Sequence, residues 1–573
     1  MSRRLQLLTA SLLLIWGMIA GRLIHLQLTQ HLKFSDHAIS QQTYDERIPA
    51  RLGDIVDRNG HLLATSSTCL SLYVDPSRLN DPSAFAARVA KVLELDEASL
   101  ITRIEAQRSR QFLWVQRRLS NEDAEAILNL ELPGKGWGLR EELRRVYPHQ
   151  TLAAHILGWR NIDGVPQAGL EKSLNQVLQG VDGSRTLVRD ARGYVIEVLE
   201  EVTQPPRHGS TVVLTLDADV QRAAELRLDE LVQVWQPRSA SAVVLDPQTG
   251  EILAMASRPT FDPAAPSTAP TGAWTNPIVS SAFEPGSTIK PCLAAWAIDQ
   301  NIVSREETFS CLGTYQMGTR LLHDHRAFGK LDLTGIITHS SNIGMAQIGQ
   351  RMGNDRLYAA VRAFGFGRKT GIELPGEAAG IVRPLERWDD YSTGSVPMGQ
   401  ELAVTPLQMV TAHAALANGG RWLTPHLVLH LSENDPQPLD VLSTSILSED
   451  IAQWMTTGPL VNVVERGTAR RAAINGINVF AKTGTAQKYD AESGAYSDTR
   501  YVSSCICGAP AEAPRVLVMV TVDETSTADE PAGGKVAAPA ASDILKAALN
   551  AIQSSSPSQR LLQIAKEKLG PTR

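Results

Sequence analysis

The sequence predicts an α+β fold in which helices flank an antiparallel sheet, preceded by a separate N-terminal region and one apolar helix. Three observations predict it. From residue 210 to 553, strand-like and helix-like segments alternate in an order typical of such a sheet. The doublet Pro205-Pro206 separates this part from an upstream region rich in Arg and Glu. Residues 5–28 form the one apolar run long enough to cross a bilayer.

Composition excludes several classes of protein. The chain has 573 residues, of which 43% are apolar and 20% charged, with a net charge of −6. This apolar fraction excludes global disorder, and the length predicts several domains. The acidic balance argues against a nucleic-acid binder, and a single apolar run excludes a multi-pass transporter. The cysteines have no zinc or disulfide spacing, so we interpret them as buried apolar residues and expect no metal and no cofactor. They are Cys69, Cys292, Cys311, Cys505 and Cys507.

The N-terminal run predicts a membrane anchor. Arg3 and Arg4 precede it, which predicts that the short N-terminal end stays in the cytoplasm and the body lies outside. The alternative is a cleavable signal peptide. The stretch 17–20, Gly-Met-Ile-Ala, is a poor cleavage site, and apolar residues continue beyond it, which favours the anchor. Either interpretation exports the body of the protein.

Turn and periodicity signals place the elements. In the upstream region, Arg58-Asn59-Gly60 predicts a turn between two short segments, 54–57 and 62–64, and residues 82–132 alternate helical patterns with polar breaks.

We expect an anchor at 1–28, an upstream domain at 29–205, a second domain at 206–553 and a mobile tail at 554–573. In the second domain we expect strands at 211–216, 241–245, 252–255, 477–485, 501–507 and 516–522, helices at 219–235 and 541–553, and a mostly helical stretch at 289–417.

The first candidate catalytic motif is Ser287-Thr288-Ile289-Lys290, the one Ser-x-x-Lys in the chain. It follows Pro285-Gly286 and opens an apolar helix, so Ser287 and Lys290 should share one helix face. A serine needs a base to become a nucleophile, and a lysine serves if burial or a nearby cation lowers its pKa. The N-terminus of the helix also favours developing negative charge.

A second motif, Ser340-Ser341-Asn342, supplies a hydroxyl and an amide where a helix can begin between Thr338 and Ser340. An ordinary N-cap serine is the competing interpretation. Two other Ser-x-Asn triplets are less suited. The triplet at 173–175 lies in the upstream region, and the triplet at 432–434 lies in a polar run that we interpret as a loop.

A third motif, Lys482-Thr483-Gly484-Thr485, follows apolar residues and is predicted on a strand. Such a strand can pair with a bound peptide and direct Lys482 at a carboxylate, while Gly484 lets the ligand approach the backbone. A second Lys-Thr-Gly begins at Lys369, but it lies in a glycine-rich loop. We therefore expect a structural role for Lys369 and a catalytic role for Lys482.

The three motifs, in this order on a helix, a helix start and a strand, resemble those of penicillin-binding proteins and serine β-lactamases. Nearly the whole chain resembles a class B penicillin-binding protein, most closely a septal, division-specific transpeptidase of a Gram-negative bacterium. The segments that carry the upstream resemblance imply an elongated pedestal domain of the dimerisation type. They are Asp57-Arg58-Asn59-Gly60, Arg145-Val146-Tyr147-Pro148, Gly169-Leu170-Glu171 and Asp190-Ala191-Arg192-Gly193. Downstream, the resemblance rests on 283–291, 246–255 and Thr405-Pro406-Leu407-Gln408.

The resemblance implies a D,D-transpeptidase that attacks a stem pentapeptide ending in D-Ala-D-Ala and cross-links peptidoglycan. Ser287 would be the nucleophile and Lys290 its base. Ser340, with Lys482, would pass a proton to the leaving amine, and Asn342 would orient Lys290. The N–H groups of Ser287 and Thr485 would form the oxyanion hole. Lys482 and Thr483 would bind the terminal carboxylate.

The resemblance also implies partners and a location. β-Lactams should acylate the nucleophile. A multi-pass glycan polymerase and other division proteins of the membrane would be partners, and nucleic acid would not. The protein would sit in the inner membrane with its catalytic domain in the periplasm.

Some residues depart from the family pattern. Cys505, Cys507 and Gly508 replace the usual Phe, Gly and Phe, which predicts altered packing beside the Lys482 strand. Glu401 stands where glycine is common, and Arg51-Leu52-Gly53 differs from the usual Arg-Gly.

Alternative functions remain open. An elongation-type transpeptidase or a condition-specific paralogue would carry the same motifs. A D,D-carboxypeptidase or β-lactamase-like hydrolase would show fast deacylation, although the anchor and pedestal argue against it. A non-catalytic division scaffold would not need the intact motifs. His323-Asp324-His325 could suggest a metal site, but no third ligand region is evident and a polar turn is the simpler interpretation.

Overall fold

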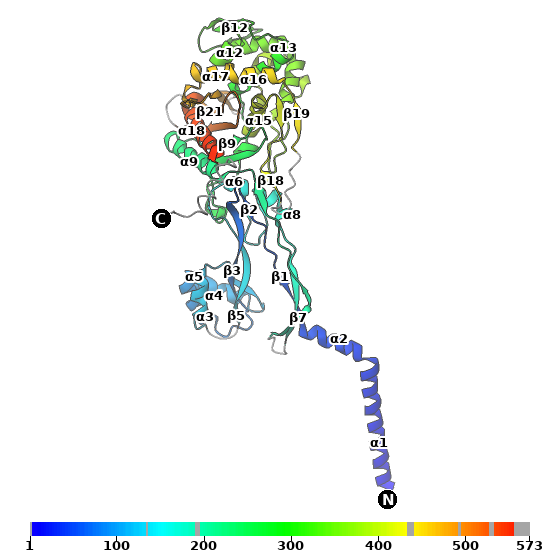
Figure 1. Ribbon diagram of the computed structural model, residues 1–573. Helices are drawn as coiled ribbons and strands as arrows, with labels where there is room; N and C mark the ends of the chain where they lie inside the picture. The colour runs from blue at the N-terminus through cyan, green and yellow to red at the C-terminus, as the bar shows by residue number, and fades with distance from the viewer. Residues whose placement is uncertain are drawn as a thin grey trace, which may run out of the picture. The chain divides into compact units, whose positions relative to one another are not determined.

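The computed structural model describes residues 3–132, 136–189, 195–431, 441–490, 494–526 and 532–554 (Figure 1). The chain forms two compact units. The first comprises Met1–Gly53 and Gln179–Gly209, and the second comprises Asp54–Leu178 and Ser210–Arg573. Most of the predicted tail, the Asp190–Gly193 segment and the triplet at 432–434 lie outside the described residues.

The first unit carries the apolar N-terminal helix. Helix α1 (Arg3–Ile24) continues into a π-helical turn, His25–Thr29, and is followed by α2 (His31–Gln42). The span Arg3–Leu28 has a mean hydropathy of 1.9, and its apolar stretch is not buried against the rest of the protein, as expected of an anchor. An antiparallel sheet completes the unit, formed by β1 (Thr43–Ile48), β6 (Gly183–Arg189) and β7 (Val195–Gln204).

The second unit begins with a six-stranded sheet in the order β18-β8-β2-β3-β4, with β5 paired to β3. The predicted turn at Arg58-Asn59-Gly60 is confirmed, and it joins the first two strands of the unit. The strands are β2 (Ile55–Val56), β3 (Leu62–Val74), β4 (Leu113–Gln116), β5 (Trp137–Val146), β8 (Val212–Leu214) and β18 (Val428–His430).

Three helices cover part of this sheet, and a polar side chain starts each. Asp81, Asp96 and Ser120 accept hydrogen bonds from backbone N–H groups in the first turns. Their apolar faces pack with Leu72 and Val74 of β3 in a separate small core. The helices are α3 (Pro82–Leu93), α4 (Glu97–Ala106) and α5 (Asn121–Leu128).

A buried carboxylate links the β2–β3 hairpin to the second part of the unit. Asp57 is fully buried. It accepts hydrogen bonds from its own turn, at Asn59 N and His61 N, and from Ala218 N at 3.0 Å. Ala218 is the first residue of α9 (Ala218–Trp235), so one side chain both closes a turn and caps a helix.

The sheet that carries the candidate site is antiparallel, with strand order β10-β9-β22-β21-β20. The predicted antiparallel sheet with helices on both faces is therefore confirmed. The strands are β9 (Ser239–Leu245), β10 (Ile252–Arg258), β20 (Phe480–Asp490), β21 (Ala495–Ala509) and β22 (Val516–Asp523). The strands predicted at 477–485 and 501–507 extend further toward each other than expected, because β20 and β21 remain paired as far as Asp490 and Ala495.

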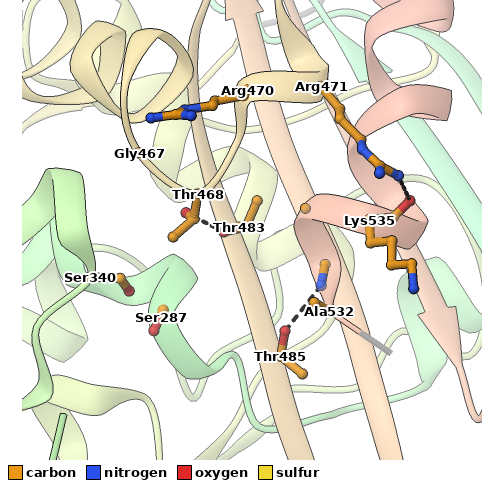
Figure 2. A pocket seen from close by; sticks show the side chains of 12 residues that line it. Ser287, Ser340, Gly467, Thr468, Arg470, Arg471, Thr483, Thr485, Ala532 and Lys535 are labelled. Carbon is orange, nitrogen blue, oxygen red and sulfur yellow. Dashed lines mark hydrogen bonds between the residues drawn. The ribbon is translucent and has the colours of Figure 1, made fainter. Parts of the chain in front are cut away.

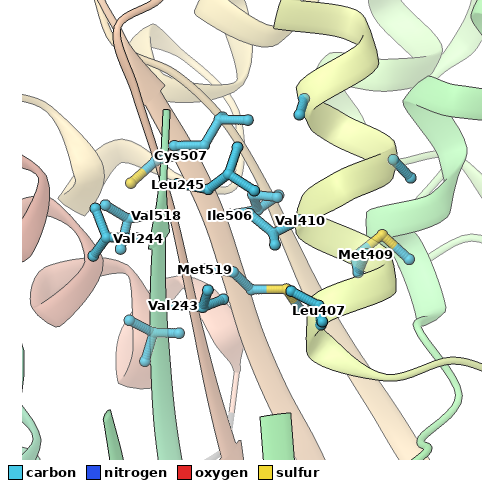
Figure 3. Close-up of a cluster of buried hydrophobic side chains, with 14 of the residues drawn as sticks. Val243, Val244, Leu245, Leu407, Met409, Val410, Ile506, Cys507, Val518 and Met519 are labelled. Atoms are coloured by element: carbon cyan, nitrogen blue, oxygen red, sulfur yellow. The ribbon is translucent and has the colours of Figure 1, made fainter. Parts of the chain in front are cut away.

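Helices bury both faces of this sheet. Helix α9 and α18 (Gly533–Ser554) pack together on one face, and α15 (Pro406–Ala417) packs on the other. Every residue of α15 is buried, and most of them are small or apolar, as expected of a helix packed on all sides. Figure 3 shows Leu407 and Val410 of α15 against Met519 and Ile506 of the sheet.

The predicted mostly helical stretch lies between β10 and β20 in the chain. Its main helices are α11 (Lys290–Asp299), α12 (Leu333–His339) and α13 (Asn342–Ala363). The shorter helices of the unit are α6 (Ala154–Leu157), α7 (Gly169–Ser173), α8 (Asn175–Leu178), α10 (Pro277–Ser280), α14 (Ser392–Ser395), α16 (Glu449–Thr457) and α17 (Pro459–Glu465). Short strand pairs are β11 (Phe309–Cys311) with β14 (Gly329–Leu331), β12 (Thr314–Met317) with β13 (Arg320–His323), β15 (Ile381–Val382) with β16 (Leu402–Ala403), and β17 (Arg421–Leu423) with β19 (Ser443–Ser445).

A buried ion triad joins separate upstream segments. Glu171 on α7 is fully buried and accepts from Arg145 Nε and from Arg160 Nε, each at 2.5 Å. Both guanidinium groups are also almost completely buried. Removing the carboxylate would leave two buried cations without their counter-charge, which is strongly destabilising.

We therefore expect Glu171→Gln to lower the free energy of unfolding by about 3–5 kcal/mol. Glu141→Gln is the matched control, because Glu141 is exposed on β5 and should change stability by less than about 0.5 kcal/mol. Near-UV circular dichroism of the full chain in detergent, followed against denaturant, measures both. Equal midpoints for the two variants would contradict a structural role for the triad.

Candidate active site

Ser287 lies on a tight turn at the mouth of a cleft. The turn is a 3₁₀-helix, Gly286–Ile289, that leads directly into α11, so the predicted helix start is confirmed with a tighter first turn. Gly286 has φ +53°, and a Cβ on Gly399 would lie 2.1 Å from the Gly286 carbonyl oxygen. Glycine at both positions therefore lets two turns meet. Ser287 is half-buried and lines a cleft of about 490 Å³ (Figure 2).

Lys290 is fully buried one helical turn after Ser287. Its Nζ donates to the Ser340 carbonyl oxygen and to Asn342 Oδ1, each at 2.7 Å, and lies 3.4 Å from Ser340 Oγ. The structure thus brings the first two motifs together. Among the contacts of the described residues, no hydrogen bond joins Lys290 to Ser287, although catalytic hydrogen bonds often tighten only when substrate is bound.

Lys482, on a strand of the sheet, brings the third motif to the same serine hydroxyl. It lies on β20, as predicted, and β20 is the edge strand of its sheet. Its Nζ donates to Ser340 Oγ at 2.9 Å and to the Thr483 carbonyl at 3.2 Å. The Ser340 hydroxyl therefore lies between two buried lysines.

The two lysines titrate far from their ordinary range. Burial, and then the charge of Lys482, lower the pKa of Lys290 well below its usual value, and Asp324 opposes this only in part. Burial lowers the pKa of Lys482 to about 7. Both amines consequently give up a proton more readily than a lysine on the surface does.

The backbone at Ser340 is unusual for a serine. Ser340 has φ 59° and ψ 38°, the left-handed region, at the end of α12. The expectation that a helix begins between Thr338 and Ser340 is wrong. The helix begins at Asn342, and the Ser341 hydroxyl caps it by accepting from Gly344 N at 3.0 Å. Local capping chemistry thus falls to the second serine, which leaves the hydroxyl of the first free to face the lysines.

Asp324 is a positioning residue that the sequence pattern did not reveal. Its carboxylate accepts from the Ser341 hydroxyl at 2.6 Å and from the backbone N–H groups of Asn342 and Ile343. It therefore holds the start of α13, from which the Asn342 side chain reaches Lys290. The His323-Asp324-His325 segment, which the sequence predicts to be a polar turn, thus holds the start of a helix through Asp324.

The residues after Lys482 line the cleft. The hydroxyl groups of Thr483 and Thr468 are 2.6 Å apart, and Thr485 Oγ1 accepts from Gly533 N at 3.0 Å. Gly484 is required for a reason other than ligand approach. A Cβ there would lie 2.6 Å from Ser504 Oγ and 3.0 Å from the Pro285 carbonyl, so glycine lets the nucleophile turn pack on the strand.

A buried histidine supports the nucleophile turn from behind. His413 on α15 donates from Nε2 to the Thr288 carbonyl oxygen at 2.8 Å. Burial lowers the pKa of His413 to about 4, so the ring is neutral at physiological pH. In the sequence, only the Thr405-Pro406-Leu407-Gln408 start marks this helix.

The competing motifs take structural positions. Lys369 lies in a loop, where the neighbouring Thr370 donates its N–H and hydroxyl to the buried Glu377 carboxylate. In the triplet at 173–175, Asn175 Oδ1 accepts a hydrogen bond from the Arg160 guanidinium at 2.8 Å.

The departures from the family pattern have local compensations. Cys505 and Cys507 are fully buried, as predicted for all the cysteines, and they face the sheet side that carries Val518 and Val520. Gly508 pairs across the strands with Phe480, and a Cβ on Gly508 would lie 2.4 Å from the Phe480 ring. The ring of Phe480 thus fills the space that a side chain at position 508 would need.

Glu401, where glycine is common, adopts φ 64°. Its carboxylate pairs with Arg383 and accepts from the Ser392 hydroxyl, while its N–H donates to Glu284 Oε1 at 3.0 Å. These contacts hold a strained backbone directly beside the nucleophile turn.

Comparison with known proteins agrees with this geometry. Residues 240–546 match the family described as the penicillin binding protein transpeptidase domain, and residues 47–214 match the penicillin-binding protein dimerisation domain. The chain is 33% identical to the probable peptidoglycan D,D-transpeptidase PenA of Neisseria meningitidis, covering 95% of this chain and 91% of that protein. It is 29% identical to the peptidoglycan D,D-transpeptidase FtsI of Escherichia coli, covering 94% and 90%.

Solved structures show the same architecture. Penicillin binding protein 3 of Mycobacterium tuberculosis, in complex with aztreonam, superposes with a TM-score of 0.67 at 29% identity, covering 89% of this chain and 97% of that one. The sequence matches span both parts of the fold, and the motif residues meet in one cleft. The chain therefore belongs to the class B penicillin-binding proteins and is a serine transpeptidase of peptidoglycan.

Proposed function

We propose that this chain cross-links peptidoglycan stems that end in D-Ala-D-Ala, through an acyl-enzyme on Ser287. The observation that carries the proposal is the Ser340 hydroxyl, held between Nζ of Lys290 and Nζ of Lys482 in the cleft that Ser287 lines. A nucleophile, a base and a proton relay are the minimum that acyl transfer to an amine requires.

In acylation, neutral Lys290 is the base for Ser287. A neutral amine has two N–H bonds, which it can donate to the Ser340 carbonyl and Asn342 Oδ1, leaving its lone pair for the incoming proton. The Ser287 oxygen then bonds to the penultimate D-Ala carbonyl carbon. By accepting from Lys290, Asn342 fixes the direction of the lone pair on Lys290 Nζ and so orients the base.

Collapse of the tetrahedral intermediate breaks the C–N bond to the terminal D-Ala. The leaving nitrogen takes a proton from the Ser340 hydroxyl, which the protonated Lys290 or Lys482 replenishes. The N–H groups of Ser287 and Thr485 stabilise the oxyanion, and β20, as an edge strand, offers backbone groups to the extended stem. Lys482 and Thr483 attract the terminal carboxylate.

The acyl group then passes to an amine of a neighbouring stem, which restores the Ser287 hydroxyl. A β-lactam places its strained amide at the same carbonyl position, so it should acylate Ser287 and remain bound. No metal or cofactor takes part in these steps, because every proton and charge is handled by the side chains described above.

At the cellular level, we propose a septal enzyme of the penicillin-binding protein 3 type from a Gram-negative bacterium. The domain plan is an anchor at 1–28, a pedestal at 29–205 and a transpeptidase domain at 206–553. Similarity to PenA and FtsI along almost the whole chain supports this plan. The N-terminus would be cytoplasmic, with the catalytic domain in the periplasm, and a multi-pass glycan polymerase and other divisome proteins would be its membrane partners. An elongation enzyme or a condition-specific paralogue is the alternative.

We expect a fluorescent penicillin to label the full chain in detergent, and Ser287→Ala to lose the label completely because the attacking oxygen is gone. Ser281→Ala is the matched control, since Ser281 is exposed just before the nucleophile turn. Gel fluorescence over time gives both the yield and the lifetime of the adduct.

The lifetime separates the alternatives. A stable adduct supports the transpeptidase, whereas rapid loss of label with hydrolysis of the drug would indicate a carboxypeptidase or β-lactamase-like enzyme. Folded protein that never takes the label would contradict catalysis altogether and leave the division scaffold.

The septal assignment has its own test in cells. Depletion of the protein should give filaments with unfinished septa, and a fluorescent fusion should gather at mid-cell. Rounded cells after depletion would instead support the elongation role, and a normal shape in rich medium would support the paralogue.

A further inference from the structure

One side of the cleft carries positive charge that the acylation steps above do not use. Arg470, Arg471 and Lys535, here called the cationic rim, line the cleft together with Thr483 and Thr485 (Figure 2). Among the residues that the structure describes, none that lines this cleft is an Asp or a Glu. The chain as a whole has a net charge of −6, so this concentration of cations is local.

The hydrogen bonds that the two arginines form within the described residues go to backbone carbonyl oxygens. Arg470 donates to the Arg466 carbonyl oxygen at 3.3 Å, and Arg471 donates to the Lys535 carbonyl oxygen at 3.5 Å. Both residues are exposed, and neither forms an ion pair within the described part of the chain. Their charge is therefore available to a ligand in the cleft.

The start of α18 adds to this potential. The helix has 22 residues, and its first N–H, from Gly533, points at Thr485 Oγ1. Gly533 packs so closely on the sheet that a Cβ would lie 2.3 Å from the Gly484 carbonyl. The positive end of a long helix is thus fixed beside the substrate-binding strand, next to the rim.

The chemistry of acyl transfer indicates which substrate lies beside the cationic rim. In the first half-reaction the leaving amine, which carries a carboxylate on its α-carbon, departs from the acyl carbon beside Thr483 and Thr485. The second half-reaction is the reverse of the first with a different amine. The acceptor amine must therefore enter where the leaving amine departed, and the groups attached to it extend over the same side of the cleft.

We infer that the cationic rim binds carboxylates of the acyl acceptor and selects an acidic stem peptide over neutral amines and water. This inference rests on the proposed function, because it concerns the second substrate of the same site. In the transfer step the acceptor nitrogen bonds to the acyl carbon, the bond from that carbon to Ser287 Oγ breaks, and the nitrogen's proton returns to Ser287 through Lys290.

The test uses the full chain in detergent and a thioester donor that ends in an acyl-D-alanyl group. The donor acylates Ser287 and releases a thiol. Two acceptors then compete for the same acyl-enzyme: a stem tripeptide that ends in a diamino acid with free carboxylates, and the same tripeptide with its carboxylates converted to carboxamides. Mass spectrometry gives the ratio of the two products, and a ratio is insensitive to changes in the rate of acylation.

We expect the wild type to favour the acidic acceptor. The double variant Arg470→Gln/Arg471→Gln should lower the product ratio by roughly two- to fivefold for each charge removed. Raising the salt from 0.15 M to 1 M should lower the wild-type ratio too, because the screening length falls to about 3 Å. Arg356→Gln is the matched control, an exposed arginine on the second half of α13, and should keep the wild-type ratio.

The outcomes separate this inference from the function on which it rests. If the acyl-enzyme forms and the double variant keeps the wild-type ratio, the rim does not select the acceptor and this inference is wrong, while the transpeptidase assignment stands. If Arg356→Gln lowers the ratio equally, overall charge and not the rim is responsible, which also overturns it. If the wild type forms no acyl-enzyme, the proposed function fails and the inference fails with it.

Discussion

The burial of two lysine side chains around one serine hydroxyl is the interaction on which the rest of this structure depends. Lys290 and Lys482 are both fully buried, and both reach the Ser340 hydroxyl. Two ammonium groups so close, away from water, are costly, and loss of one proton removes most of that cost. The fold therefore makes a neutral amine available at neutral pH, which a surface lysine would not be.

The surrounding elements hold this arrangement in place. Asp324 fixes the start of α13, His413 fixes the carbonyl of Thr288, and glycines at 286, 399 and 484 let the nucleophile turn pack against its neighbours. Each contact comes from a different element, so the site is defined by tertiary packing on a rigid sheet. The same packing places the start of α18 and the cationic rim beside the strand that would bind the stem.

Sequence reasoning could predict the motifs and the sheet, because both are local patterns. Ser287 before an apolar helix and Lys482 within an apolar strand carry their own structural context, and the structure places them together with Ser340 and Asn342. Sequence reasoning could not predict the role of Asp324. This residue lies 17 residues upstream of Ser341, and a helix cap supplied from so far away leaves no periodic signal. Nor could it predict which serine caps α13, because adjacent serines have equal propensity and only the left-handed turn at Ser340 decides.

The protonation state of Lys290 is the central claim, and a direct titration tests it. Carbon-13 labelling of the lysine Cε atoms in the full chain, with the Lys290 signal identified by its loss in Lys290→Arg, follows the amine by NMR as pH rises. The account predicts that Lys290 loses its proton well below the ordinary lysine value, because burial and the charge of Lys482 disfavour its ammonium form. Titration of Lys290 near the ordinary value of about 10.4 would contradict it, because the base would then be protonated whenever the enzyme is at work.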